Sequence, residues 1–269
     1  MSQTLPPLLL IGCGKMGGAM LSGWLERGLA EAWVVEPNPA AAGRFAGKAR
    51  VVPDAAALPA ELRPAAVVLA IKPQEAAATL PALARFAGMA VFLSIMAGRT
   101  IGFLRGGLGE SAAVVRAMPN TPAAVGQGYT VACPGPGVTG AQRSLCDALL
   151  TAVGLVDWVE QEALLDPVTA VSGGGPAYVF LLAELLEAAA IEQGLPTPLA
   201  RRMARATVAG SGALLAASEE DAAALRRAVT SPKGTTERAL AVLMEEAAWP
   251  GLISRAIAAA TARSRELAG

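Results

Sequence analysis

The sequence predicts a doubly wound α/β domain followed by an all-helical domain, on three observations. In the first 160 residues, short runs rich in β-branched residues alternate with alanine-rich stretches that end at glycine or proline. This rhythm is typical of βαβ units and of a mainly parallel sheet with helices on both faces. A glycine-rich turn follows the first run, and strand-like runs stop after about Glu160. We therefore expect domains over residues 1–160 and 161–269.

Seven runs predict strands, and the first five have the length and composition of buried strands. The last two are expected to lie at one edge of the sheet. The runs cover 8–12, 33–36, 67–71, 90–95, 113–118, 129–133 and 155–159.

In the second half of the chain, the sequence pattern predicts helices and no strands. One long helical pattern extends from Glu162 to Leu195 and is expected to break or bend at the glycine run Gly173–Gly175. Four further helices are bounded by the usual breaker residues. Their apolar faces are broad and need a partner surface, for which a second subunit is the obvious candidate. They cover about 198–217, 221–230, 234–247 and 251–267.

The composition excludes several classes of chemistry. The 269 residues include no histidine, which removes Ser-His-Asp triads, Cys-His pairs and histidine-ligated zinc. Lys+Arg and Asp+Glu both number 22, so the chain has no basic field to attract nucleic acid or anionic lipid. The three cysteines (Cys13, Cys133 and Cys146) have neither metal-ligand spacing nor a pairing logic. We expect a bound cofactor, and no metal, to carry the chemistry.

The sequence also predicts where the protein works. No uninterrupted apolar run approaches the ~20 residues that a membrane-spanning helix needs. The N-terminus has neither the basic start nor the cleavage site of a signal peptide. Three unpaired cysteines fit a reducing compartment. We expect a cytoplasmic protein that associates with neither membrane nor nucleic acid.

The turn after the first strand predicts a dinucleotide site. Gly12, Gly14 and Gly17 have the G-x-G-x-x-G spacing between a buried strand and a helix. The first glycine permits the tight turn, the second lets backbone approach a pyrophosphate, and the third lets the helix pack close to the strand. A tight turn without a nucleotide is the alternative.

Glu36 bears on the choice of dinucleotide. It ends the second strand, 24 positions after Gly12, where an acidic residue commonly accepts ribose hydroxyls and repels a 2′-phosphate. That rule alone favours NAD. Asn38 with Arg44 or Lys48 could still hold a phosphate, and a solvated strand-end glutamate is a third reading.

Polar loops follow three other strands. The stretches "AIKP" (70–73) and "SIMAG" (94–98) lie at carboxyl ends of strands, where doubly wound sheets bind ligands. Lys72 could reach a ligand there or simply cap the strand. In "RAMPNTPAAVGQG" (116–128), two prolines bracket Asn120 and Thr121. This rigid loop suits the floor of a nicotinamide pocket, with a structural turn as the alternative.

Two clusters in the second half offer room or hydroxyls. The glycines before Pro176 leave space for a ligand or for the backbone of a neighbouring subunit. In "TSPKGTTERAL", Thr235 and Thr236 stand at a helix start with Ser231 nearby. A threonine there is usually an N-cap, but two in succession also suit an anion site for a small carboxylate.

Together these stretches resemble the pyrroline-5-carboxylate reductase family. They occur in the family's order and cover nearly the whole chain. The matching stretches are "IGCGKMG", "AIKP", "SIMAG", "RAMPNTPA", "SGGGPAYVF" and "SPKGTTERAL".

The resemblance implies an α/β N-terminal Rossmann-like doubly wound domain followed by an all-α C-terminal dimerisation domain. It implies reduction of L-1-pyrroline-5-carboxylate to L-proline by hydride transfer from NAD(P)H, the last step of proline biosynthesis. The implied cofactor is NADP(H), with NAD(H) possible because of Glu36. The implied assembly is a homodimer or a larger ring of dimers.

The resemblance also implies the site residues. Thr236 would be catalytic and closest to the substrate's ring nitrogen. The substrate would lie among Glu219, Ser231, Gly234, Thr235 and Thr236. The cofactor would contact Ile11, Gly12, Cys13, Gly14, Lys15, Met16, Gly17, Asn38, Ala70, Ile71, Lys72, Pro73, Ile95, Met96, Ala97 and Asn120.

The chain departs from the family pattern at three positions. Lys233 replaces a usual glycine, Gly174 replaces a common serine, and Glu36 stands where the family is often small or neutral. An imine reductase acting on another ring and a β-hydroxyacid-dehydrogenase-like enzyme are alternatives. The latter would need a lysine in the first long C-terminal helix, and none lies between Glu160 and Gln193. A non-catalytic nucleotide-sensing dimer is a further alternative.

Overall fold

The computed structural model describes residues 5–29 and 31–268. These residues divide into two compact units. The sheet unit extends to Gly173 and resumes at Ala260, and the helical unit covers Gly174–Ala259. The predicted boundary near residue 160 stays a prediction. The division by packing falls later because the short helix α6 (Leu165–Val168) packs on the sheet.

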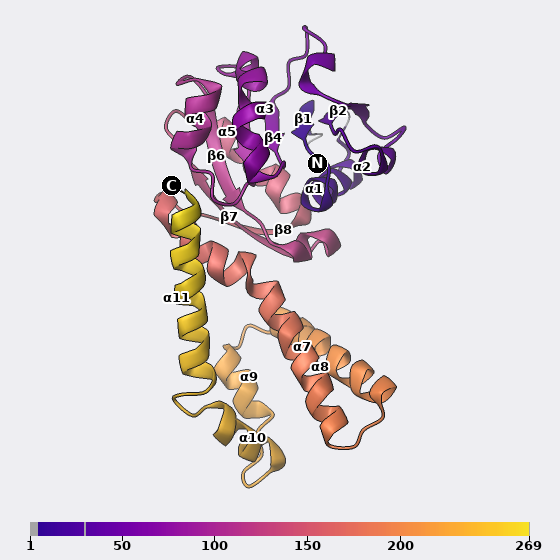
Figure 1. The fold of residues 1–269 in the computed structure, drawn as a ribbon, viewed down its shortest axis with the longest axis vertical. Coiled ribbons are helices and arrows are strands. Elements are labelled where there is room, and N and C mark those ends of the chain that lie inside the picture. Colours follow the sequence, from indigo (N-terminus) through magenta and orange to yellow (C-terminus); the bar gives the residue numbers. More distant parts are fainter. Residues whose placement is uncertain (1–4, 30, 269) are drawn as a thin grey trace. The chain divides into compact units, whose positions relative to one another are not determined.

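The sheet unit is built on one eight-stranded sheet (Figure 1). Its strands are β1 (Leu8–Ile11), β2 (Ala32–Val35), β3 (Arg50–Val52), β4 (Ala66–Leu69), β5 (Val91–Ser94), β6 (Ala113–Met118), β7 (Gly128–Pro134) and β8 (Gly154–Trp158). Their order is β3-β2-β1-β4-β5-β6-β7-β8. All adjacent pairs are parallel except β6 and β7. The seven predicted strands are confirmed, with β7 and β8 at one edge as expected.

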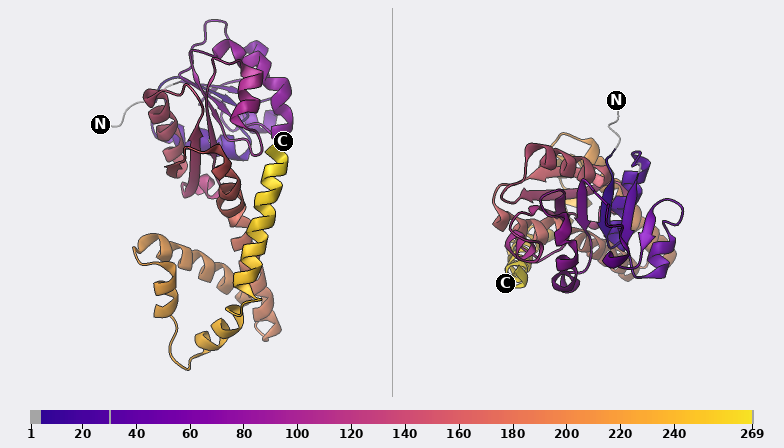
Figure 2. Two further views of the ribbon diagram at one scale, coloured as in Figure 1. Left: turned by 90° about the vertical axis from the view of Figure 1, so that its left-hand side faces the viewer. Right: turned by 90° about the horizontal axis from the view of Figure 1, so that it is seen from above.

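The two faces of the sheet are covered by different helices (Figure 2). Along β1, Leu8 and Leu10 join one apolar cluster, whereas Leu9 and Ile11 join the other. Successive strand residues point to opposite faces, so a strand buried on both sides reads as a continuous apolar run. Helices α1 (Lys15–Glu26) and α5 (Gly140–Leu150) cover the first face, and α3 (Ala76–Leu83) and α4 (Ile101–Leu108) cover the second.

The predicted long helix is broken, as expected, near the glycine run. A turn of π-helix at Thr169–Gly173 separates α6 from α7 (Gly175–Glu192). The four later helices also form: α8 (Thr197–Ala217), α9 (Ala222–Ala228), α10 (Thr235–Leu243) and α11 (Trp249–Ala268). Helix α10 ends four residues before the predicted position. Two acidic residues, Glu245 and Glu246, follow it, and negative charge disfavours a helix C-terminus.

One helical stretch corrects the expectation about apolar length. Residues Glu162–Glu192 are long and apolar enough to cross a membrane by length and composition alone. The stretch has no charged side chain from Pro167 to Ala183, although small and hydroxyl residues interrupt its apolar run. Its π-helical turn and two prolines mark it as an irregular helix.

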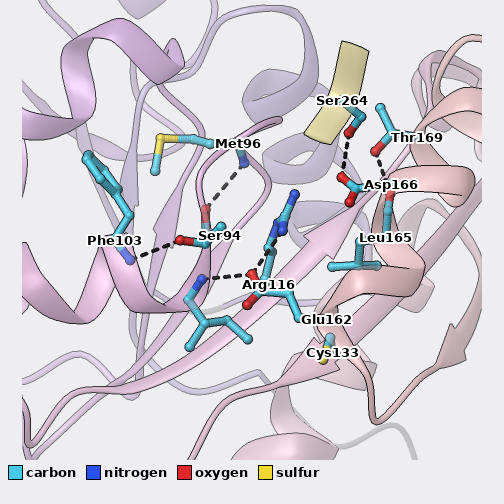
Figure 3. Close-up of polar contacts among 12 residues, drawn as sticks. Ser94, Met96, Phe103, Arg116, Cys133, Glu162, Leu165, Asp166, Thr169 and Ser264 are labelled. Atoms are coloured by element: carbon cyan, nitrogen blue, oxygen red, sulfur yellow. Dashed lines mark hydrogen bonds and ion pairs between the residues drawn. The ribbon is translucent and has the colours of Figure 1, made fainter. Parts of the chain in front are cut away.

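Polar contacts join the segment after β8 to β6, to α4 and to α11 within the sheet unit (Figure 3). Glu162 Oε1 accepts from the Arg116 guanidinium at 2.9 Å and from the Ile101 backbone N–H at 2.8 Å. In α11, the Ser264 hydroxyl donates to Asp166 Oδ1 at 2.7 Å, and both side chains are buried. Buried polar groups must be satisfied in this way, so the bond from Ser264 holds the last turns of α11 against the segment that contains Asp166.

Candidate functional site

The glycine loop between β1 and α1 has the predicted geometry. Gly12 has a φ of +88°, and a Cβ there would lie 2.8 Å from the Ala70 carbonyl oxygen. A Cβ on Gly17 would lie 2.2 Å from the Gly12 carbonyl oxygen. Both positions therefore require glycine, one for the turn and the other for close packing of α1.

Gly14 differs from its two neighbours. A Cβ there would meet no atom within 4 Å, and its φ of −60° suits any residue. Gly14 is the N-cap of α1, with no side-chain cap and no acidic residue in the first turn. The helix start thus presents backbone N–H groups and the positive end of its dipole beside open space. These features fit the phosphates of a dinucleotide.

Glu36 binds the loop directly. Its Oε2 accepts the Cys13 backbone N–H at 2.8 Å, and its Oε1 accepts the Asn38 N–H at 2.9 Å. Burial raises the pKa of the Cys13 thiol to about 11, and the nearby Glu36 carboxylate adds to the rise. Asn38, predicted to contact cofactor, accepts the Ala40 N–H and caps the short helix α2 (Pro39–Gly43).

A cavity of about 300 Å³ lies at the carboxyl ends of the parallel strands. Eight residues predicted to contact cofactor line it: Met16, Ala70, Ile71, Pro73, Ile95, Met96, Ala97 and Asn120. Four further residues line it: Gly173, and Met118, Pro119 and Thr121 from the loop 116–128 that was expected to form the floor of a nicotinamide pocket. Of the other residues predicted to contact cofactor, Ile11 and Cys13 have side chains buried in the apolar core, and Lys15 and Lys72 have exposed side chains.

Two polar side chains hold the walls of this cavity. The Arg99 Nε–H donates to the Pro73 carbonyl oxygen at 2.9 Å and so joins the loops after β4 and β5. Asn120 accepts the Tyr129 backbone N–H at 2.9 Å and donates to the Ser172 hydroxyl at 3.2 Å. The Asn120 amide therefore positions the loop after β6 against β7 and the π-helical turn.

The π-helical turn brings Gly173 to the cavity. A Cβ at Gly173 would lie 2.7 Å from Met118 Cε, so glycine leaves room for the methionine that lines the pocket. Turns of π-helix are frequent at functional sites. The sequence signal was the glycine run, which left a ligand and a neighbouring subunit as alternatives.

The predicted substrate residues all lie in the helical unit. Gly234 is the N-cap of α10, and its N–H donates to the Ser231 carbonyl oxygen at 3.0 Å. Thr235 and Thr236 are the first two helical residues, so neither is the N-cap. Thr235 is exposed and Thr236 is half-buried.

A carboxylate lies at the same helix start. The Lys233 backbone N–H donates to Glu237 Oε2 at 2.8 Å. Because Gly234 binds Ser231 and directly precedes the two threonines, the turn brings these four residues together. Glu219 precedes α9, and no hydrogen bond or ion pair joins it to this turn in the part of the chain that the structure describes.

Comparison with known proteins matches both parts of the chain. Residues 162–267 match the family model described as pyrroline-5-carboxylate reductase dimerisation, and residues 8–98 match one described as NADP oxidoreductase coenzyme F420-dependent. The chain is 37% identical to pyrroline-5-carboxylate reductase of Pseudomonas aeruginosa over 98% of this chain and 97% of the relative. The chain belongs to the pyrroline-5-carboxylate reductase family.

Solved structures agree with this family. The pyrroline-5-carboxylate reductase of Coxiella burnetii is 31% identical, with a TM-score of 0.91 over 99% of this chain and 100% of that one. The Plasmodium falciparum pyrroline carboxylate reductase, solved with NADP bound, is 25% identical, with a TM-score of 0.82 over 98% of each chain. The fold predicted from the sequence, a Rossmann-like domain followed by a helical dimerisation domain, is confirmed.

Proposed function

We propose that this chain reduces L-1-pyrroline-5-carboxylate to L-proline with NAD(P)H, the last step of proline biosynthesis. The observation that carries the proposal is the near full-length similarity to pyrroline-5-carboxylate reductases. The open glycine loop and the cavity at the strand ends support it, because they fit a dinucleotide.

The residues of the sheet unit bind and orient the cofactor. The N–H groups at the start of α1 receive the phosphates, and the cavity walls fix the position of the nicotinamide ring. The bound nicotinamide supplies the hydride. The hydrogen bonds of Arg99 and Asn120 hold the loops that form the walls, and Asn120 also lines the cavity as a cofactor contact.

The residues of the helical unit bind the substrate. We assign the substrate carboxylate to the start of α10, where backbone N–H groups and the hydroxyls of Ser231, Thr235 and Thr236 favour an anion. Gly234 lets the backbone of this turn approach the substrate. Glu219 lies beside the substrate, and Thr236 contacts its ring nitrogen. The chain needs no histidine, because a protonated imine is already electrophilic and catalysis becomes a task of positioning and electrostatics.

The proposal extends to assembly and location. The helical unit exposes large apolar side chains, among them Phe180, Leu181 and Leu185 on α7, and large exposed apolar patches mark interaction sites. We assign them to a homodimer, with a ring of dimers as the larger assembly. The same burial accounts for the apolar stretch Glu162–Glu192 without a membrane. We place the enzyme in the cytoplasm, acting on a small molecule rather than on nucleic acid.

The test follows reduced-nicotinamide absorbance with protein, the cyclic imine and either NADPH or NADH. We expect oxidation above background, and Thr236→Val to raise KM or lower kcat at least tenfold. Thr79→Val, in α3 and outside the cavity, serves as the matched control. Wild-type kinetics in Thr236→Val would refute that residue's role. Turnover of another cyclic imine alone would indicate an imine reductase, and no turnover of either would indicate a non-catalytic dimer.

A further inference from the structure

We propose that Glu36 makes this chain prefer NAD(H) to NADP(H). Because this preference concerns the cofactor of the proposed reaction, it rests on the proposed function. The two cofactors differ by the 2′-phosphate on the adenosine ribose. In doubly wound domains, an acidic residue after the second strand accepts the ribose hydroxyl, whereas a nearby arginine accommodates the phosphate.

The carboxylate of Glu36 is held in place by both of its oxygens. One accepts the N–H of Cys13 in the glycine loop, and the other accepts the N–H of Asn38 after β2. Glu36 is half-buried, so its charge is only partly screened by water. The carboxylate therefore lies fixed between the phosphate loop and the end of β2, where a ribose is bound in this fold.

The same two bonds disfavour a 2′-phosphate. A phosphate that used the Cys13 and Asn38 N–H groups would first have to displace the carboxylate. A phosphate beside them would add negative charge close to an existing negative charge, which is unfavourable. Ribose hydroxyls can instead donate hydrogen bonds to the carboxylate oxygens, each of which accepts more than one.

Arg44 is the nearby cation that would favour a phosphate. Gly18 lies in the first turns of α1, and a Cβ added there would be 3.3 Å from Nη1 of Arg44. The Arg44 guanidinium also lies 5.5 Å from the Phe45 ring centroid. Arg44 is exposed, whereas the carboxylate of Glu36 is anchored. We expect the anchored acid to decide the preference, and its neutralisation to let Arg44 attract the phosphate.

The test measures binding to the full chain without imine. Titration calorimetry gives dissociation constants for NADH and NADPH, and for ADP-ribose and its 2′-phosphorylated analogue. We expect wild type to bind each unphosphorylated ligand at least tenfold more tightly. Glu36→Gln should shift the NADH-to-NADPH affinity ratio at least tenfold toward NADPH, and Arg44→Ala in that background should reverse the gain. Glu31→Gln removes the same charge at the start of β2 and should leave the ratio unchanged.

The outcomes separate this preference from the proposed function. Wild type that binds the phosphorylated ligands equally or more tightly overturns the preference, while imine turnover would leave the proposed function standing. An unchanged ratio in folded Glu36→Gln overturns the role of Glu36. No binding of any of the four ligands overturns both proposals. If Glu36→Gln does not fold, the wild-type comparison of the two ADP-riboses decides alone.

Discussion

Lys233 has a backbone conformation that its residue type disfavours. Its φ is +59°, and among the described residues it is the one non-glycine residue with a positive φ. The left-handed conformation costs an L-residue roughly 1–2 kcal/mol, and glycine avoids that cost. The resemblance already placed Lys233 where the family usually has glycine, and the backbone gives the physical reason for that glycine.

We expect Lys233→Gly to be more stable than Lys233→Ala by about 1 kcal/mol. Both variants remove the charge, but only glycine removes the backbone strain. Urea denaturation at neutral pH measures the difference through the shift of the midpoint. Equal midpoints would show that this turn changes conformation to accept alanine.

The glycine loop allows a second comparison between neighbouring residues. Gly17→Ala should destabilise the fold by about 1–3 kcal/mol, because its Cβ would lie 2.2 Å from a backbone oxygen. Gly14→Ala should leave stability within about 0.5 kcal/mol, because its Cβ meets only open space. It should nevertheless weaken dinucleotide binding at least tenfold by blocking the approach of the pyrophosphate.

Thermal melts and cofactor titration of the two variants check this pair. Gly14→Ala with wild-type affinity would show that the pyrophosphate does not approach this backbone. Gly17→Ala with wild-type stability would show that α1 moves away from the strand at little cost.

At the scale of elements, the sequence predicted what depends on long regular patterns. Apolar runs identified seven strands, and those of the central strands are continuous because both faces of the sheet are covered there. The strand β3 escaped notice because three residues are too few to show a pattern. The π-helical turn was not predicted either, because a glycine run indicates a break in a helix but not the geometry of that break.

The position of the site was also predictable in part. The motifs located the loops that form the cavity, because parallel strands end at one edge of the sheet. The loop 116–128 lines the cavity as expected, but which of its side chains face the cavity depends on its exact course, so the sequence named Asn120 alone of its lining residues as a cofactor contact. The bond between Cys13 and Glu36 joins residues 23 positions apart, and only the fold brings them together.

The stability of the fold depends on pH through the Cys146 thiol in α5. Burial raises the pKa of the Cys146 thiol from its ordinary value of 9.0 to about 12. Above pH 9 the unfolded chain therefore loses a proton that the folded chain keeps, so stability falls as pH rises toward 12. The slope from this thiol is at most about 1.4 kcal/mol per pH unit.

Guanidinium denaturation at pH 8 and 10.5 tests this prediction with Cys146→Ala as the comparison. The alanine variant lacks the titrating thiol, so wild type should lose more stability than the variant between the two pH values. Parallel losses would show that Cys146 keeps its ordinary pKa or deprotonates without penalty.

At the scale of the whole molecule, the roles that we propose for cofactor and substrate binding fall on different units. The predicted cofactor residues lie in the sheet unit and the predicted substrate residues in the helical unit. The helical unit also has the apolar surface that we assign to a second subunit. In a two-fold dimer, each substitution on that surface changes the interface at two positions, because both subunits use the same patch.

We expect Phe180→Glu to weaken the dimer at least a hundredfold. Phe180 is 67% exposed in the single chain, and burial of such a side chain contributes about 1.5–3 kcal/mol. The charge adds a desolvation penalty. Sedimentation equilibrium over a dilution series measures the dissociation constant. Met89→Glu, an equally large change on the sheet unit, should leave it unaltered.

The return of the chain at Ala260 has a practical consequence for dissection. A fragment that stops at Gly173 would lose Ser264 and leave the Asp166 carboxyl stranded, so simple truncation should yield an unstable piece. Excising the intervening 86 residues and splicing the C-terminal segment back through a flexible tether would restore that contact. Such a shortened chain is the form in which nucleotide recognition can be studied apart from catalysis.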